Sequence, residues 1–152
     1  MADKVKWLRP VSGATLTSPD MPQKTTIAFA NLSNAAGMAV DKDHNIYVSD
    51  SARHVIFKYR WGSQSAPIVF AGSYDTAALA DGQGTAARFN QPGAMAIDAS
   101  GVLWVIDVGN NRVRRIDENA NVYTVAATNA AAGDPICVDA SGNLFFVEAS
   151  ES

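Results

Sequence analysis

Residues 92–113 read PGAMAIDASGVLWVIDVGNNRV, and they form the middle copy of a pattern that occurs three times in the 152-residue chain. The tetrapeptide that ends in Asp98 matches the tetrapeptides that end in Asp41 and Asp139. A second acid follows each of these aspartates at the same distance, at Asp50, Asp107 and Glu148. A repeat with fixed internal spacing predicts a repeat architecture.

Each copy is typical of short β-strands joined by tight turns. Segments such as 46–48 and 103–105 combine aromatic and β-branched residues, which strands favour. Turn-forming dipeptides stand between the first two segments of each copy: Asp43-His44, Ser100-Gly101 and Ser141-Gly142. Because His44 takes the place of a glycine, we expect a positive φ there. Four short antiparallel strands in about 40–45 residues make the unit of a β-propeller blade.

The sequence therefore predicts an all-β protein of four-stranded antiparallel propeller blades. We expect strands at residues 26–30, 37–41, 46–49, 55–59, 67–71, 94–98, 103–106, 112–116, 122–126, 135–139 and 144–147. A single helical turn is expected around Thr85–Phe89. The connection from Phe70 to Asp98 is the main difference between the copies, and we expect it to lie outside the sheets, as insertions in repeat proteins do.

The stretch from Pro92 to Val113 resembles the NHL repeat, and Asp50–Ile56 is a weaker copy of its motif, with Val55 where that family usually has arginine. The connection from Asp81 to Pro92 is similar to the loop that joins the blades of many bacterial NHL propellers. The resemblance covers the chain from Thr25 onward. It implies a propeller, usually six-bladed, that displays loops for binding.

Two full copies and half of a third predict an incomplete NHL-type propeller of about 2.5 blades at residues 25–152, whereas a closed propeller needs at least about four. Half-built blades leave unpaired strand edges, which proteins avoid. Either the chain is one part of an assembly, or it is a fragment of a longer protein. In an assembly, a protein partner or a second copy would complete the propeller and contact residues 133–152. Residues 1–24 are expected to form an arm, extended or docked on that partner.

The repeated acids are interpreted as structural. An acid that recurs in every copy serves the repeat by accepting backbone N–H groups in turns; this interpretation applies to Asp41, Asp50, Asp98, Asp107 and Asp139. Metal ligands around a central channel are the alternative for these acids. The two histidines, His44 and His54, have no partner at the spacing of a zinc site. The sequence thus predicts no catalytic residue, no metal site and no cofactor.

Six residues are candidates for contact with a protein partner. Tryptophan and arginine are favoured as interface anchors, and the arm carries Trp7 and Arg9. The loop candidates are Arg53, His54, Asn110 and Asn111. The net charge of −3 gives no long-range attraction to nucleic acid or to an anionic membrane. The N-terminus has no apolar signal core, so synthesis in the cytoplasm is expected.

The leading functional prediction is a non-enzymatic interaction or structural module. A chain rich in alanine, asparagine, serine and threonine, with a proline-broken arm, resembles virion components of tailed phages, such as a fibre or a capsid decoration, anchored by the arm. One alternative is a gluconolactonase-like metal-dependent propeller hydrolase. Those propellers hold a metal with acidic and amide side chains, including an early glutamate that has no match among Glu118, Glu148 and Glu151.

The other alternative is an RNA-binding NHL domain, which uses a basic propeller face. Basic residues cluster at 53–60 and 112–115. We expect the cations on these predicted strands to point into solvent, where they protect strand edges.

Overall fold

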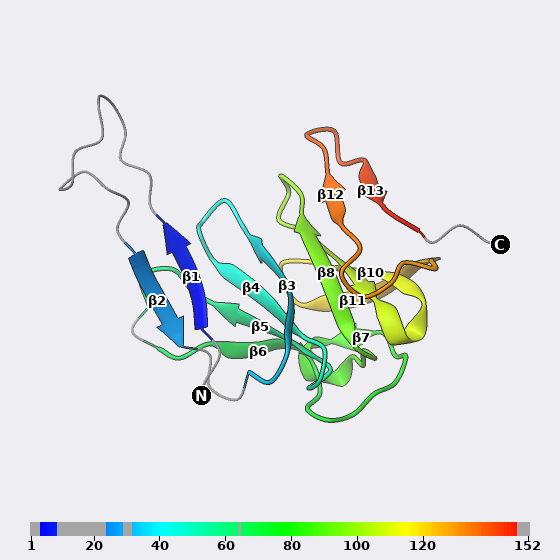
Figure 1. Cartoon of the computed structure of the whole chain (residues 1–152), viewed down its shortest axis with the longest axis horizontal. Coiled ribbons are helices and arrows are strands. Elements are labelled where there is room, and N and C mark those ends of the chain that lie inside the picture. Colours follow the sequence, from blue (N-terminus) through cyan, green and yellow to red (C-terminus); the bar gives the residue numbers. More distant parts are fainter. Residues whose placement is uncertain (1–3, 9–23, 29–31, 64, 149–152) are drawn as a thin grey trace.

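The computed structural model describes residues 4–8, 24–28, 32–63 and 65–148, and this part of the chain is nearly all β (Figure 1). Near the N-terminus, β1 (Lys4–Leu8) and β2 (Lys24–Ala28) pair antiparallel in a two-stranded sheet. The expected strand at 26–30 therefore begins two residues earlier, and residues 29–30 lie outside the described part. No helix in the described ranges is long and apolar enough to span a membrane.

The first copy is a complete blade. Its sheet follows chain order, with β3 (Ala35–Val40), β4 (Ile46–Asp50), β5 (Val55–Tyr59) and β6 (Ile68–Gly72), all antiparallel. Every residue of β4 is buried, because neighbouring elements cover both faces of this strand. His44, in the turn before β4, has φ 63°, which confirms the prediction for that position.

The second copy is a blade of four strands with a short fifth on its outer edge. The four strands are β8 (Pro92–Ile97), β9 (Leu103–Asp107), β10 (Arg112–Ile116) and β11 (Asn121–Ala127). The fifth, β7 (Gly82–Gln83), belongs to the connection between the blades and pairs with β11. The expectation that this connection lies wholly outside the sheets is wrong, because β11 offers an unpaired edge that the connection covers.

The two 3₁₀ helices of the described residues are single turns. One, η2 (Gly84–Ala86), lies within the connection, where a helical turn was expected, and the other, η3 (Val108–Asn110), follows β9. Within the described residues, which end at 148, the third copy has only β12 (Ile136–Val138) and β13 (Leu144–Phe146), which pair antiparallel. The all-β, four-stranded blade architecture and its partial third copy are therefore as predicted.

The first two blades pack closely along their first strands, β3 and β8. A Cβ atom at Gly37 would lie 2.4 Å from the carbonyl oxygen of Gly93, so no other residue fits there. The Ser49 hydroxyl donates a buried hydrogen bond of 2.7 Å to the same carbonyl and ties β4 to the second blade. The main core cluster, which includes Tyr47 and Phe89, draws its side chains from both blades. The two blades thus share one core.

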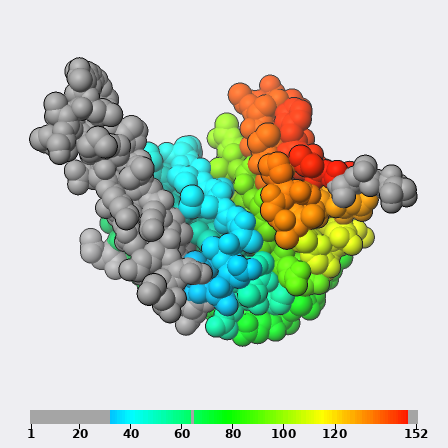
Figure 2. Space-filling model, in the orientation of Figure 1, coloured from blue at the N-terminus to red at the C-terminus, as the bar shows by residue number. Residues whose placement is uncertain are grey.

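The side chains of the third copy are less buried than those of the first two blades. Leu144 and Phe146 pack against the second blade, but the side chains between and after them, Phe145 and Val147, are 55% and 50% exposed. In Figure 2 the orange and red residues of this copy stand at one edge of the molecule. Cys137 is also exposed, because no other blade of the described residues covers that face of β12.

Candidate functional site

Three of the repeated acids organise the turn after the first strand of each copy. The Asp41 carboxylate accepts the backbone N–H groups of Asp43 and Asn45 and the Asn45 side-chain amide. Asp98 and Asp139 accept the corresponding N–H groups in their own turns. Burial raises the pKa of Asp41, but its hydrogen bonds outweigh that effect and leave the pKa below its ordinary value. These are the contacts that a turn-fixing role requires.

The other repeated acids, Asp50 and Asp107, are fully buried. Asp50 accepts four backbone N–H groups, from Ser33, Asn34, Ala52 and Arg53. Asp107 accepts only one backbone N–H group from the described residues, that of Asn90, together with hydrogen bonds from Asn110 Nδ2 at 2.7 Å and Arg114 Nη1 at 2.8 Å. Burial raises the pKa of Asp107, while these hydrogen bonds and the positive charge oppose the rise.

Arg114 is an unexpected partner of Asp107, because the arginine side chain has no exposed surface. Its Nη1 group also donates to the carbonyl of Arg88, and its Nη2 group donates to the carbonyl of Ala80 and to the Asp81 carboxylate. The guanidinium lies 5.0 Å from the centre of the Phe89 ring. The expectation that the cations of this strand point into solvent is therefore wrong for Arg114, whose charge is compensated by Asp107 and Asp81.

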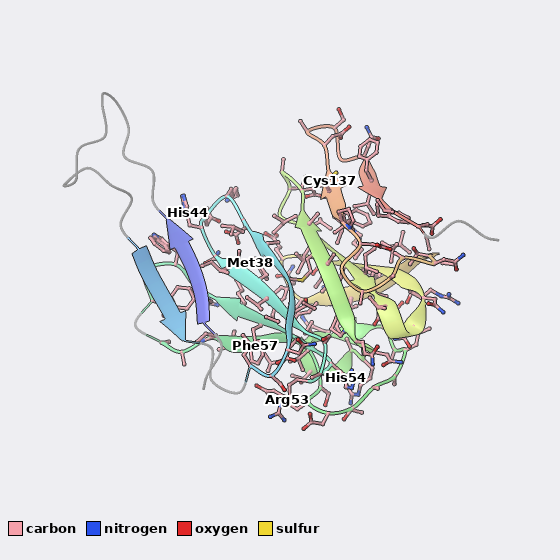
Figure 3. All side chains as sticks on the ribbon, in the orientation of Figure 1. Met38, His44, Arg53, His54, Phe57 and Cys137 are labelled. Atoms are coloured by element: carbon pink, nitrogen blue, oxygen red, sulfur yellow. The ribbon has the colours of Figure 1, made fainter. Side chains whose placement is uncertain are left out.

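The four loop candidates for partner contact lie at the end of the blades where β4 and β9 finish. Figure 3 labels Arg53 and His54 at the lower end of the sheets. Arg53 pairs with Asp75 at 3.0 Å, and His54 Nδ1 accepts the N–H of Gln91 at 3.0 Å. Asn110 is held between Asp107 and a carbonyl, whereas Asn111 is exposed in a left-handed conformation.

The arm candidates are placed only in part. The backbone of Trp7 lies in β1, and Arg9 falls outside the described residues, as do most of residues 1–24. Contact with a partner therefore stays a prediction for all six candidates.

A hollow of about 360 Å³ lies where the first strands of the blades begin. We call it the strand-start hollow; its wall consists of Asn34, Ala36, Ser51, Ala52, Gln91, Gly93, Val108 and Ala132, drawn from all three copies. Asn34 Nδ2 donates to the Ser51 hydroxyl at 2.7 Å. Gln91 has φ 55°, a conformation that costs a non-glycine residue energy and that tends to occur at functional sites.

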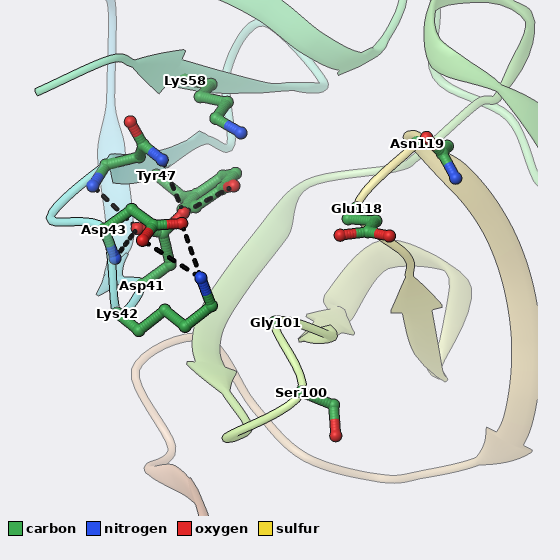
Figure 4. A pocket seen from close by; sticks show the side chains of 10 residues that line it. Asp41, Lys42, Asp43, Tyr47, Lys58, Ser100, Gly101, Glu118 and Asn119 are labelled. Carbon is green, nitrogen blue, oxygen red and sulfur yellow. Dashed lines mark hydrogen bonds and ion pairs between the residues drawn. The ribbon is translucent and has the colours of Figure 1, made fainter.

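A second hollow, of about 230 Å³, lies at the opposite end of these strands (Figure 4). We call it the turn hollow, because turns of both complete blades form it: Asp41, Lys42, Asp43, Asn45, Tyr47, Lys58, Ser100, Gly101, Glu118 and Asn119. The ammonium group of Lys58 lies 5.0 Å from the centre of the Tyr47 ring and 5.2 Å from that of Phe70. The sequence alone does not predict this hollow, because the turns that form it come together only in the fold.

Burial perturbs two titratable groups in the turn hollow. It lowers the pKa of Lys58, although the carboxylates of Asp41, Asp43 and Glu118 favour the charged form. It also raises the pKa of Tyr47, whose hydroxyl donates to the Asp41 carboxylate, and the charge of Asp41 adds to that rise. Perturbed groups that line a hollow mark a candidate site.

The described histidine, cysteine and acidic side chains do not form a metal centre. No three His, Cys, Asp or Glu side chains among residues 32–63 and 65–148 come together in a way that could hold an ion. The strand-start hollow offers the amides of Asn34 and Gln91 but no carboxylate in its wall. The repeated acids, which could have been ligands around a channel, are instead occupied by hydrogen bonds from their own turns.

The blades define the chain as part of a β-propeller, and comparison with known proteins agrees. The sequence model of the SMP-30/gluconolactonase/LRE-like family matches residues 8–138, and the chain belongs to this family. The NHL repeat is a related pattern that this match does not specifically confirm. No curated protein sequence matches the chain.

Several solved structures share the fold. An auxiliary nutrient binding protein from Bacteroides thetaiotaomicron has a TM-score of 0.63 at 16% identity, over 80% of this chain and 37% of the other. Streptogramin B lyase has a TM-score of 0.59 at 15% identity, over 84% and 38%. A luciferin-regenerating enzyme has a TM-score of 0.58 at 16% identity, over 83% and 40%. The chain thus spans well under half the length of these three propellers.

The family membership corrects the functional prediction. The prediction that the chain is not an enzyme is contradicted, because the family includes gluconolactonase and SMP-30 enzymes. The fold part of the prediction, a propeller module, holds. The virion interpretation gains no support from the family or from the structures named above.

Proposed function

We propose that this chain is part of a propeller hydrolase of the gluconolactonase class, which hydrolyses a small lactone or ester bound in the strand-start hollow. The observation that carries the proposal is the family match across residues 8–138. The hydrolase alternative of the sequence analysis thus replaces the non-enzymatic module as the leading hypothesis.

The strand-start hollow suits substrate binding because all three copies contribute to its wall. Sites between structural units are where small-molecule ligands commonly bind. Asn34, Ser51 and Gln91 supply amide and hydroxyl groups that can hydrogen-bond a carbonyl or ring oxygen, while Val108 and Ala132 supply apolar contact. The role of these groups would be to orient the substrate.

The backbone at Gln91 supports a binding role for its side chain. The left-handed conformation is held by the hydrogen bond from the Gln91 N–H to His54 Nδ1, and the residue is exposed at the hollow. A glycine would occupy this conformation without strain. A glutamine kept there at an energetic cost is consistent with a use for the amide.

The wall contains no carboxylate, histidine or lysine, so this hollow lacks a general base among its described residues. Nor do three His, Cys, Asp or Glu side chains of the described residues come together to hold the metal that gluconolactonase-like propellers use. We therefore assign binding and orientation, and no proton-transfer step, to this part of the chain.

The test is hydrolysis by the purified chain of δ-gluconolactone, a γ-lactone and a linear aryl ester, with and without Ca²⁺, Mg²⁺, Mn²⁺ or Zn²⁺. Gln91→Gly should lower kcat/KM about three- to tenfold, since it removes one hydrogen-bonding group without backbone strain. His44→Gly is the matched control, because His44 is also exposed at positive φ but lies at the other end of its blade. Absence of hydrolysis for every substrate and metal would overturn the proposal.

A further inference from the structure

We propose that the turn hollow is a second binding site, for a neutral polyhydroxylated molecule of monosaccharide size. The proposal does not depend on the proposed hydrolase activity, because this hollow lies at the opposite end of the strands and shares no residue with the other. It rests on the hydrogen-bonding groups that line the hollow and lack partners.

The first of these groups is the ammonium of Lys58. The side chain is half-buried on β5, and its nitrogen makes no hydrogen bond or ion pair with the described residues. Its contacts are instead the faces of the Tyr47 and Phe70 rings. Because a partly buried charge without hydrogen bonds is unfavourable, a ligand oxygen beside this nitrogen would be stabilised. In Figure 4 the Lys58 side chain points toward the hollow.

The opposite wall presents polar side chains that complement the Lys58 ammonium. The Glu118 carboxylate, the Asn119 side-chain amide and the Ser100 hydroxyl have no partner among the described residues. Figure 4 shows the Glu118 carboxylate facing the first blade across the hollow. A carboxylate accepts hydrogen bonds and an ammonium donates them. The ligand must therefore both donate and accept, which a set of hydroxyl groups does.

The charges of the hollow favour a neutral ligand. Lys42 is already paired with Asp43 at 2.9 Å, so Lys58 is the only cation free to meet an anion among the lining residues. The carboxylates of Asp41, Asp43 and Glu118 would repel a phosphate or a carboxylate. A metal ion is not favoured either, because Lys58 repels it and the three carboxylates do not come together as ligands. A hydroxyl-rich molecule can hydrogen-bond to both the ammonium and the carboxylates without bringing a charge of its own into the hollow.

The size of the hollow limits the ligand. A volume of about 230 Å³ is below the roughly 300–1,000 Å³ of pockets for drug-sized ligands, which points to one sugar ring or a short polyol. For so small a ligand in an open site, we expect a Kd of about 1–10 mM.

The test is an NMR titration of the ¹⁵N-labelled chain with D-glucose and with sorbitol, up to about ten times the expected Kd. Saturable shifts are expected at Ser100, Gly101 and Asn119. Lys58→Met should weaken binding about threefold or more because it removes one hydrogen bond, and Glu118→Gln should do the same because it replaces a charged acceptor with a weaker neutral one. Arg60→Met is the matched control, because Arg60 lies two residues after Lys58, is exposed and does not line this hollow.

Three outcomes would overturn the proposal. They are no saturable shift with either sugar, tighter binding of inorganic phosphate or glycine than of glucose, and unchanged sugar affinity in the Glu118→Gln variant. Should Lys58→Met fail to fold, as judged by its spectrum, Glu118→Gln still decides, because the Glu118 side chain is exposed and makes no hydrogen bond or ion pair with the described residues.

Discussion

Replacing Arg114 by alanine should destabilise the chain more than replacing any other basic residue of the blades. The side chain is fully buried and donates four hydrogen bonds, two to carboxylates and two to carbonyls. The bond to Asp107 dominates, because both partners are buried; removal of one partner from such a pair costs about 3–5 kcal/mol. The bond to Asp81, which is half-exposed, adds at most about 1 kcal/mol.

The measurement is urea unfolding followed by tryptophan fluorescence. With a slope of roughly 1–3 kcal/mol per molar, the midpoint should fall by at least about 1 M. The control is Arg112→Ala on the same strand, since the Arg112 guanidinium donates only to the carbonyl of Asn111 and should cost less than about 1 kcal/mol. Arg114→Lys should be intermediate, because one ammonium keeps the charge but cannot reach four acceptors. A cost for Arg114→Ala no larger than that for Arg112→Ala would refute the reasoning.

Three further predictions follow from the acids and the third copy. Asp50→Ala should cost about 1–3 kcal/mol in urea unfolding, because it leaves buried backbone N–H groups unpaired; a cost under about 0.5 kcal/mol would contradict the structural role. Hydrogen bonds from Asn121 and Asn143 hold the pKa values of Asp117 and Asp139 below the ordinary 3.8. The stability that these ionised carboxylates provide should be present at neutral pH and lost as the pH falls below about 4. In an acid titration, the Asp117→Asn variant should therefore lose less unfolding free energy over this range than the parent chain does. Finally, the 1–152 chain should associate with itself or a partner through residues 133–152, as checked by size exclusion with light scattering; a stable monomer at micromolar concentration, with protected amides at 133–148, would contradict this.

Much of the fold could be predicted from the sequence because the repeat fixes both the strands and the turns. The strand from Val55 to Tyr59 and that from Arg112 to Ile116 were predicted to the residue. The ends of the other predicted strands differ from those in the structure by a few residues at most, since strand pairing rather than composition decides where a strand stops. β1 was not predicted, because residues 1–24 were expected to form an arm. β7 could not be predicted, because Gly82-Gln83 has no strand-like composition and pairs only where the edge of β11 is available.

The candidate sites were harder to predict, because each depends on groups that only the fold brings together. Gln91 meets His54 across the two blades, and Lys58 faces Glu118 from a different sheet. Cys137 takes the repeat position of Ala39 and Ala96, which are buried, yet it is exposed because no other blade of the described residues lies against β12. Periodicity predicts the face of a strand, but it does not say whether a neighbour covers that face.

The first two copies each bury a carboxylate at the end of the second strand, and they satisfy its hydrogen-bonding capacity in two ways. Phe57 and Arg114 occupy equivalent positions in the repeat and both are fully buried. The first copy supplies four backbone N–H groups to Asp50, so the neighbouring position can be apolar. The second copy supplies one to Asp107 and adds Arg114, whose remaining donors hold the connection at Ala80 and Asp81. Residues shared by the copies therefore maintain the blades, whereas residues that differ between copies, such as Arg114, Gln91 and Lys58, give each blade its particular contacts.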